Sequence, residues 1–415
     1  MKKKLFLLGL IVSTLAQGQT ITLPEVLNKL KENNYEIKSQ EQQVEIDSLK
    51  VKQGFKNILP GANLEVDTQI LNNEKYKDGA SVFGPQKISA GYTVYAGGRI
   101  VNNYKKTKKD YAISEKQLKT VQQNMEIKAI ELYFQILNLE KQIEITNLAK
   151  ESLLKQENRL NILFSNNKMV SKNELLEVKA DIMSIDAEVL SYNNDLRLAK
   201  EKLFVLIGSD ITSDYKFNQY EEEFLLKNME QLEKDIEIAK NSGNTALKKQ
   251  LEIEKAELDV KIAKAGFLPT IRFTGEYRLD DKIKTSDKNG DWGLEPEASM
   301  NVFQWGATLD SIKSSKIELN RKVNEKNNSL ENLSVEIRGK HSKIEQLKKE
   351  LEISVERSNL LEENSRIQNI RFTNGLLSSL NYLESVQLFR KAEEKKYAVQ
   401  KNLILANREY NNLIK

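Results

Sequence analysis

The chain contains no cysteine, and it has one histidine, His341, among 415 residues. Without thiols it can form neither disulfides nor thiolate metal sites, and it cannot be anchored through a lipidated cysteine. A single histidine leaves no second imidazole for a His-based metal site and no histidine pair for acid–base chemistry. These absences exclude most enzymes and metal centres that depend on cysteine or histidine.

Proline is also scarce, with five residues at positions 24, 60, 85, 269 and 296. No proline lies between residues 86 and 268 or after 296, so these tracts contain no obligate helix breaker. Two long helices are therefore predicted over 99–164 and 307–372, and each would span roughly 100 Å. Shorter helices are predicted over 23–59, 171–207, 247–268 and 379–415. Two short helices stacked end to end would match one long helix in length.

Apolar residues of the first long tract form two adjacent stripes. One stripe alternates steps of four and three residues, the spacing of a coiled-coil seam, and consists of Met125, Ala129, Leu132, Ile136, Leu139 and Ile143. The second stripe consists of Ile127, Ile130, Phe134 and Leu137. A helix with two neighbouring stripes packs against two other helices, as a closed ring of helices requires.

Long hydrophobic runs are missing except at the start of the chain. Three lysines at positions 2–4 precede an apolar stretch from Leu5 to Val12, and Ala16-Gln17-Gly18 offers the small residues that a signal peptidase reads. Residues 1–18 are therefore predicted to be a secretory signal, because the apolar run is too short to cross a bilayer. No later apolar stretch approaches 18 residues, so a membrane-spanning part would have to be built from β-strands.

The chain has no excess of either charge, since 64 basic and 60 acidic residues give a net charge of +4. Removing the three lysines of the signal leaves +1, which argues against a nucleic-acid partner because such proteins carry a concentrated basic face. Charged residues make up 30% and apolar residues 39% of the chain. This balance is typical of elongated helices with narrow apolar seams rather than of one large core.

The sequence repeats itself at an offset of about 208 residues. Leu59-Pro60 recurs as Leu268-Pro269, and Val94-Tyr95 recurs as Val302-Phe303. The segment Phe164-Ser165-Asn166 recurs as Phe372-Thr373-Asn374. Each copy is predicted to contain a helix, two strands, a long helix and a further helix. The copies are placed at 19–207 and 244–415, with a linker or small side domain at 208–243.

Four segments alternate apolar and polar residues with a period of two, and they are predicted to be strands at 62–71, 86–96, 270–280 and 292–303. Each has about ten residues, one apolar face and one charged face, which is the pattern of a strand with lipid on one side and water on the other. A pair of soluble hairpins with one buried face would show the same alternation. Four strands cannot close a barrel, so three copies are expected to supply twelve.

The order and duplication of several short motifs resemble the TolC family of outer-membrane efflux proteins over the whole mature sequence. Thr22-Leu23-Pro24-Glu25-Val26, with Asn33-Asn34, resembles the opening of that family, and Ala265-Gly266-Phe267-Leu268-Pro269 resembles its helix-to-strand junction. Tyr95-Ala96-Gly97-Gly98-Arg99 resembles its strand-to-helix junction, although the usual preceding proline and the aspartate are missing.

The resemblance implies a mainly α fold with a β-barrel: a homotrimer whose twelve-stranded outer-membrane barrel, with four strands from each chain, continues into a long periplasmic α-helical barrel. It implies partners in the outer-membrane lipid, a periplasmic adaptor and an inner-membrane transporter. Such channels catalyse nothing and are expected to need no cofactor or metal. They conduct substrates passively in efflux or type I secretion. A periplasmic adaptor and a structural coiled-coil protein are the alternatives.

Two groups of site residues follow from the resemblance. The turns that connect each long helix to the next helix face the adaptor in this family, which makes Asn166, Asn167, Lys168, Met169, Ser171, Asn374, Gly375, Leu376, Leu377 and Ser379 docking candidates. The same residues could simply close helical hairpins. Just past the second turn the family carries two aspartates that ring the periplasmic entrance, and the matching positions here are Asn381 and Glu384. Glu384 could line the entrance and favour cations, or it could be an ordinary solvated residue.

Overall fold

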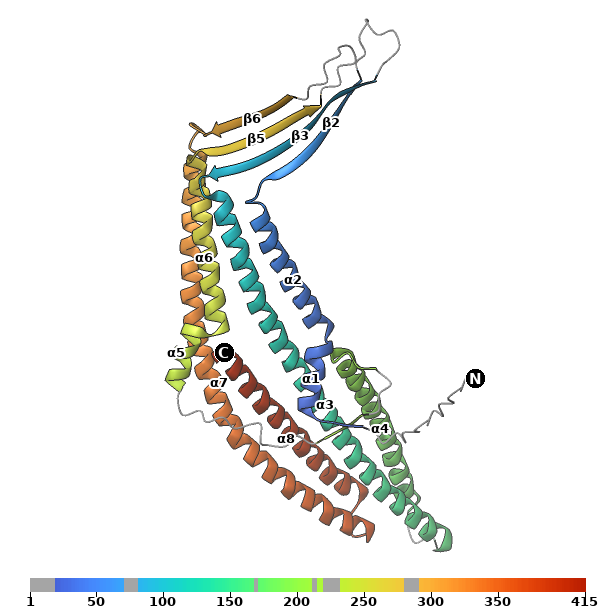
Figure 1. Cartoon of the computed structure of the whole chain (residues 1–415). Coiled ribbons are helices and arrows are strands. Elements are labelled where there is room, and N and C mark those ends of the chain that lie inside the picture. The colour runs from blue at the N-terminus through green and yellow to red at the C-terminus, as the bar shows by residue number, and fades with distance from the viewer. Residues whose placement is uncertain (1–18, 71–80, 168–170, 211–214, 219–231, 280–290) are drawn as a thin grey trace, which may run out of the picture. The chain divides into compact units, whose positions relative to one another are not determined.

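The computed structural model describes residues 19–70, 81–167, 171–210, 215–218, 232–279 and 291–415. The predicted signal at 1–18 lies outside these ranges. The described part of the chain consists mainly of helices, together with one four-stranded sheet and one short pair of strands (Figure 1). The predicted mainly α fold with four longer strands is confirmed.

The two longest helices are α3, Arg99–Asn167, and α7, Ala307–Thr373, and both begin where the proline-free tracts predict. The other helices are α1 Leu23–Asn33, α2 Tyr35–Lys56, α4 Lys172–Leu206, α5 Leu232–Ser242, α6 Asn244–Lys264 and α8 Ser379–Ile414. A single 3₁₀ turn, Ala265–Phe267, follows α6. Among the described residues, no helix combines the length and the apolar character needed to cross a membrane.

The larger sheet has the antiparallel order β2-β3-β5-β6, with β2 at Gly61–Ile70, β3 at Ser81–Ala96, β5 at Thr270–Leu279 and β6 at Asp291–Ser299. Ala90 of β3 lies opposite Ala62 of β2 and Gly275 of β5. β3 begins earlier than the expected residue 86, and β6 ends before the expected residue 303. β6 stops there because Ser299 pairs with Thr270, the first residue of β5.

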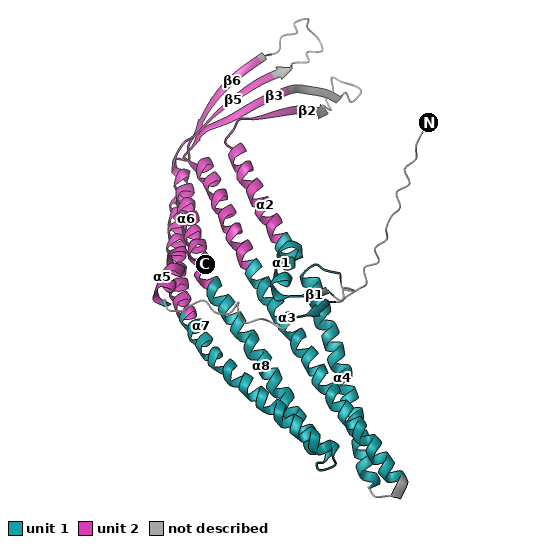
Figure 2. Cartoon of the chain, turned by 60° about the horizontal axis from the view of Figure 1, so that its bottom comes forward, with its two compact units in different colours: residues 1–38, 121–232, 338–412 teal, residues 39–120, 233–337, 413–415 magenta. Residues whose placement is uncertain are grey.

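The chain divides into two compact units, coloured separately in Figure 2. Unit 1 comprises Met1–Lys38, Val121–Leu232 and Arg338–Asn412, and unit 2 comprises Ser39–Thr120, Glu233–Ile337 and Leu413–Lys415. Unit 1 contains both ends at which a long helix turns into a shorter one. Unit 2 contains the four-stranded sheet.

In unit 1, the paired asparagines connect the end of α4 to the start of α2. The Asn34 side-chain amide donates to the Leu206 carbonyl at 2.7 Å, and its oxygen accepts from the Ile37 backbone amide at 2.9 Å. Gly208 has φ +61, and a Cβ there would lie 2.7 Å from Asn33 Cβ. The close approach therefore requires glycine, and α2 starts directly at the end of α4.

The segment predicted as a linker or side domain, 208–243, contains β4, Tyr215–Phe217, and the whole of α5. β4 pairs in parallel with β1, Gln19–Ile21. The Tyr133 hydroxyl of α3 donates to the Asn218 carbonyl at 2.6 Å, which ties this small sheet to the long helix. The apolar stripes predicted on α3 are buried here, with Met125, Ala129 and Ile136 from one stripe and Ile130 and Phe134 from the other.

In unit 2, the start of α6 and the end of the chain meet the same turn of α3. The Asn244 side-chain amide donates to the Lys116 carbonyl at 3.1 Å, and the Lys119 ammonium donates to the Lys415 carbonyl at 3.1 Å. These contacts bring a short helix and the chain terminus together beside one long helix, which is the local arrangement that end-to-end stacking of the short helices requires.

Candidate functional site

The turn that connects α7 to α8 has a defined backbone. Gly375 has φ +74, its amide donates to the Phe372 carbonyl at 2.9 Å, and the Leu376 amide donates to the Arg371 carbonyl at 2.8 Å. This hydrogen-bond pattern ends a helix with a residue in the left-handed region, where glycine is favoured. Arg159 of α3 donates to the Thr373 carbonyl at 2.8 Å and so holds the turn against the other long helix.

A hydrophobic cluster lies directly behind this turn. The Phe372 and Tyr382 rings stack with centroids 4.7 Å apart and planes 10° apart. Burial raises the pKa of the Tyr382 hydroxyl, which therefore stays neutral. The cluster joins α3, α4, α7 and α8 and consists of Ile145, Ala149, Leu153, Leu160, Leu175, Val178, Ile182, Ile185, Phe372, Tyr382, Val386 and Phe389. The turns are thus supported by a continuous core.

The predicted docking residues of the second turn fall into two groups. Asn374, Gly375 and Leu376 are exposed, and the Leu376 side chain is 71% exposed. Leu377 instead packs against the hydrophobic cluster, and Ser379, the first residue of α8, is 7% exposed. Of the predicted docking residues of this turn, Asn374, Gly375 and Leu376 are therefore the exposed ones.

Few of the docking residues predicted for the first turn are described. The Ser171 hydroxyl accepts from the Asn173 amide at 3.2 Å and caps α4. Lys168 and Met169 lie outside the described residues, and so do the side chains of Asn166 and Asn167.

Three exposed apolar residues near the turns were not among the predicted docking residues: Ile162, Leu176 and Leu380. Each lies within about two helical turns of a helix end. An apolar side chain at a solvated helix end is the sequence signal that could have identified them.

The two predicted gate residues share one face of α8. Asn381 and Glu384 are three residues apart and both are exposed. The opposite face of the same turn is buried, with Tyr382, Ser385 and Val386 directed into the core. The gate positions thus point away from the hydrophobic cluster, toward whatever space the helix borders.

A buried arginine that the sequence did not identify connects three helices of unit 1. Arg390 of α8 donates to the Glu188 carboxylate of α4 at 2.6 Å and to the Tyr192 hydroxyl. Its Nε contacts the side-chain oxygen of Gln142 on α3 at 3.4 Å, and the Gln142 amide donates back to the Arg390 carbonyl at 3.3 Å. Because the guanidinium is buried, these partners replace the water that it loses. Arg390 therefore fixes α8 against α3 and α4.

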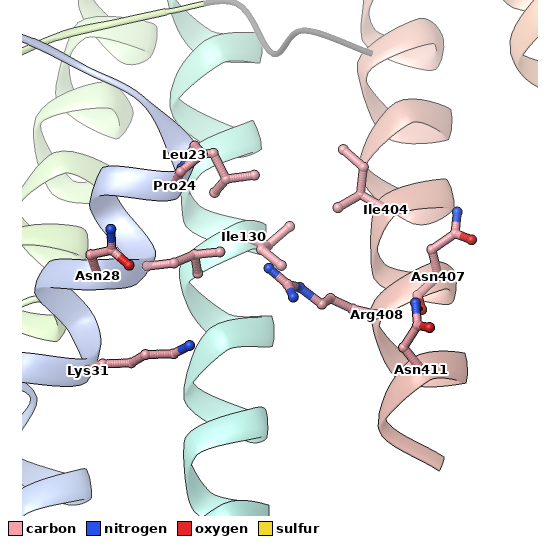
Figure 3. A pocket seen from close by; sticks show the side chains of 10 residues that line it. Leu23, Pro24, Asn28, Lys31, Ile130, Ile404, Asn407, Arg408 and Asn411 are labelled. Atoms are coloured by element: carbon pink, nitrogen blue, oxygen red, sulfur yellow. Dashed lines mark hydrogen bonds between the residues drawn. The ribbon is translucent and has the colours of Figure 1, made fainter. Parts of the chain in front are cut away.

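A cavity of about 340 Å³ lies between α1, α3 and α8 (Figure 3). Its wall includes Lys31 and Arg408, which approach the Glu126 carboxylate at 3.0 Å and 3.9 Å. The single Glu126 carboxylate offsets only one of these two positive charges, so this part of the wall keeps a net positive charge. Within the described ranges, no three His, Asp or Glu side chains are grouped closely enough to hold a metal ion.

Comparison with known proteins finds a family similar to residues 241–412 and a fold for nearly all of the chain. Residues 241–412 match the family described as "Outer membrane efflux protein". No curated protein matches. The Campylobacter jejuni CmeC outer membrane channel aligns with a TM-score of 0.75 at 16% identity, covering 94% of this chain and 85% of that one.

Two further channel structures agree. The open state of the Neisseria gonorrhoeae MtrE outer membrane channel gives 0.75 at 16% identity over 94% of this chain and 88% of that one. VceC, an outer membrane protein of Vibrio cholerae, gives 0.70 at 15% identity over 94% and 95%. The chain therefore has the fold of these outer-membrane proteins, and its residues 241–412 are similar to the outer membrane efflux protein family, in agreement with the resemblance that the sequence motifs show.

Proposed function

We propose that this chain is one subunit of a passive exit channel of the outer membrane, which conducts substrates delivered by an inner-membrane transporter and a periplasmic adaptor. The observation that carries the proposal is the open four-stranded sheet. Its outer strands, β2 and β6, each pair on one side only in the described chain, and they carry exposed apolar side chains such as Leu64, Trp292 and Leu294. Such a sheet is stable in lipid only when its edges are closed.

Closure by copies of the same chain gives a homotrimer. Three subunits supply 3 × 4 = 12 strands, an even number within the range of outer-membrane barrels. The alternating faces of β5 and β6 then place apolar residues against lipid and charged residues such as Glu295 and Glu297 toward an aqueous lumen. The apolar stripes on α3 and the exposed apolar residues of α4 and α7 support side-by-side packing of the helices into a second ring.

The hairpin ends are the proposed docking surface for the adaptor. Leu376 and Leu380 are exposed beside a rigid turn, and exposed apolar residues at such a place are typical of a protein-binding surface. Asn374, Gly375, Ser171 and the residues of the first turn complete the proposed surface. Neither docking nor conduction requires catalysis or a cofactor, because the transporter supplies the energy.

The proposed gate is a ring of three Glu384 carboxylates, one from each subunit, with Asn381 one turn away. Carboxylates that border an aqueous pore attract cations and repel anions. The Glu384→Gln trimer in a planar bilayer under a salt gradient should therefore lose much of its cation selectivity, and Asn381→Asp should gain selectivity. Unchanged reversal potentials in both variants would remove this face of α8 from the gate.

The function as a whole is tested by cell fractionation and by gel migration with and without heating. A trimeric barrel sediments with the outer membrane and runs as an oligomer until it is boiled. A periplasmic adaptor or a soluble coiled-coil protein would not behave in this way. Recovery of a detergent-free, soluble monomer from the periplasm would contradict the proposal.

A further inference from the structure

The two strand-to-helix junctions of the chain have the same local conformation. Gly98 has φ +82 and its carbonyl accepts from the Asn102 amide at 2.9 Å. Gly306, 208 residues later, has φ +85 and its carbonyl accepts from the Asp310 amide at 3.0 Å. The internal repeat therefore extends to the backbone, and β3 with α3 corresponds to β6 with α7.

The corresponding strands nevertheless differ in length. β3 continues to Ala96, because its last residues pair with β5, from Tyr92 opposite Phe273 to Ala96 opposite Thr270. β6 ends at Ser299, and within the described chain residues 300–304 have no strand beside them. Their side chains are correspondingly bare, with Val302 85% exposed. The sequence predicts that residues 300–303 continue β6 as a strand, and what they lack within the described chain is a neighbouring strand to pair with.

β2, the strand at the other edge of the sheet, also lacks a pairing partner on its outer side among the described residues. In the described structure β2 pairs with β3 on one side and with nothing on the other. Its first residues, Gly61–Glu65, are exposed, and Leu64 is 68% exposed. By the internal repeat, β2 corresponds to β5, since Leu59-Pro60 corresponds to Leu268-Pro269.

We propose that residues 299–304 of one subunit pair with residues 61–65 of a second copy in the same antiparallel register that β3 keeps with β5. This inference rests on the proposed function and specifies how its subunits join. Adding 208 to the β3 residues and subtracting 209 from the β5 residues converts each internal pair into a pair between copies. The expected pairs are Ser299 with Glu65, Met300 with Leu64, Asn301 with Asn63, Phe303 with Ala62 and Gln304 with Gly61, with Val302 at the irregularity that follows Thr93 in β3.

The register satisfies the alternation of both strands. It places apolar Met300 opposite apolar Leu64, and the Asn301 amide opposite the Asn63 amide. A shift by one residue would move every apolar side chain to the opposite face. A shift by two residues leaves every side chain on the same face of the sheet, so the alternation of apolar and polar residues does not distinguish between such registers. The internal repeat does distinguish between them, because it specifies one register.

The same conversion by the repeat offset also predicts a contact for Trp305 in the second copy. Its counterpart, Gly97, packs so closely against Leu268 that an added Cβ would lie 2.9 Å from Leu268 Cβ. Trp305 is the one non-glycine residue of the described chain with a positive φ, +50, and it is 90% exposed, beside Phe303 with ring centroids 5.0 Å apart. A bulky residue in this backbone region is strained. Leu59 corresponds to Leu268, so Trp305 is expected to lie against Leu59 of the second copy.

The absence of cysteine allows a direct test by disulfide crosslinking in outer membranes. Ser299→Cys with Glu65→Cys joins residues expected to be directly opposite, where Cα atoms about 5 Å apart allow a disulfide. The matched control is Ser299→Cys with Asn63→Cys, on the same face but displaced by two residues, roughly 7–8 Å away. Thr93→Cys with Arg272→Cys, an internal pair, reports that oxidation is complete.

The expected result is about tenfold more crosslinked oligomer from the Ser299/Glu65 pair than from the Ser299/Asn63 pair. The register would be wrong if the Ser299/Asn63 pair crosslinked more than or as much as the Ser299/Glu65 pair. It would also be wrong if a heat-sensitive oligomer formed that neither pair crosslinks. None of these outcomes would contradict the proposed channel function. If the unmodified protein forms no oligomer in the membrane, the proposed function fails together with the register.

Discussion

At the scale of single residues, the start of α1 shows how a short sequence motif becomes a stable helix end. Thr22 precedes the helix, and its backbone amide and hydroxyl donate to the Glu25 carboxylate at 2.8 Å and 3.0 Å. The two residues form a capping box, and Pro24 occupies the first turn, where it needs no hydrogen bond. The motif that resembles the opening of the family is therefore a device that starts a helix.

This capping box predicts a dependence on pH. The hydrogen bond from the Thr22 backbone amide holds the pKa of Glu25 below its ordinary value of 4.5. An acid with a lowered folded pKa stabilises the helix above the unfolded pKa, and this stabilisation is lost as the pH falls through the folded pKa. Amide hydrogen exchange in α1, corrected for intrinsic rates, should therefore accelerate between about pH 6 and about pH 3.

The Glu25→Gln variant is the control, since its amide does not titrate in this range. Its α1 should exchange faster than the wild type above pH 4.5 and should lack the step at low pH. The same acid-induced step in both proteins would show that another group is responsible.

At the scale of elements, proline positions, alternation and the internal repeat were sufficient to predict the two long helices, the four strands and the turns between helices. Each of these signals is local, because a helix or strand pattern repeats within a few residues. The Arg390 network was not predictable in this way, since Gln142 and Glu188 are far from Arg390 in sequence. The burial of Ser379 and Leu377 was missed for the same reason, because only the packed hairpins show which side of a turn is covered.

The turn between α7 and α8 gives a prediction at this scale. Gly375→Ala places a side chain at φ +74, where an added Cβ would also lie 2.7 Å from the Arg159 guanidinium. The strain should cost about 1–2 kcal/mol. Protease cleavage at this turn should therefore become faster at a fixed urea concentration.

Gly339→Ala is the matched control, because Gly339 lies inside α7 and a Cβ there meets nothing within 4 Å. Alanine at this position should stabilise the helix by about 0.5–1 kcal/mol. Equal effects of the two substitutions would mean that the left-handed backbone at Gly375 is not required.

At the scale of the whole molecule, the single subunit exposes apolar side chains that neighbouring subunits or lipid would cover in the proposed trimer. Exposed apolar side chains occur on the strands, on α4 at Met183 and Leu190, and on α7 at Ile353 and Leu360. In the proposed trimer, neighbouring subunits cover the helical residues and lipid covers one face of the strands.

Two adjacent residues of β6 separate the contribution of lipid from that of the strand itself. Leu294 and Glu295 are both exposed, and their side chains project from opposite faces of the sheet. Leu294→Arg should put a charge into lipid near the middle of the membrane at a cost of about 2–4 kcal/mol per subunit. Glu295→Arg should be tolerated, because its side chain would face water. Heat-sensitive oligomer in the outer-membrane fraction should therefore be lost in Leu294→Arg and kept in Glu295→Arg, whereas the opposite result would place the lumen on the other face of the sheet.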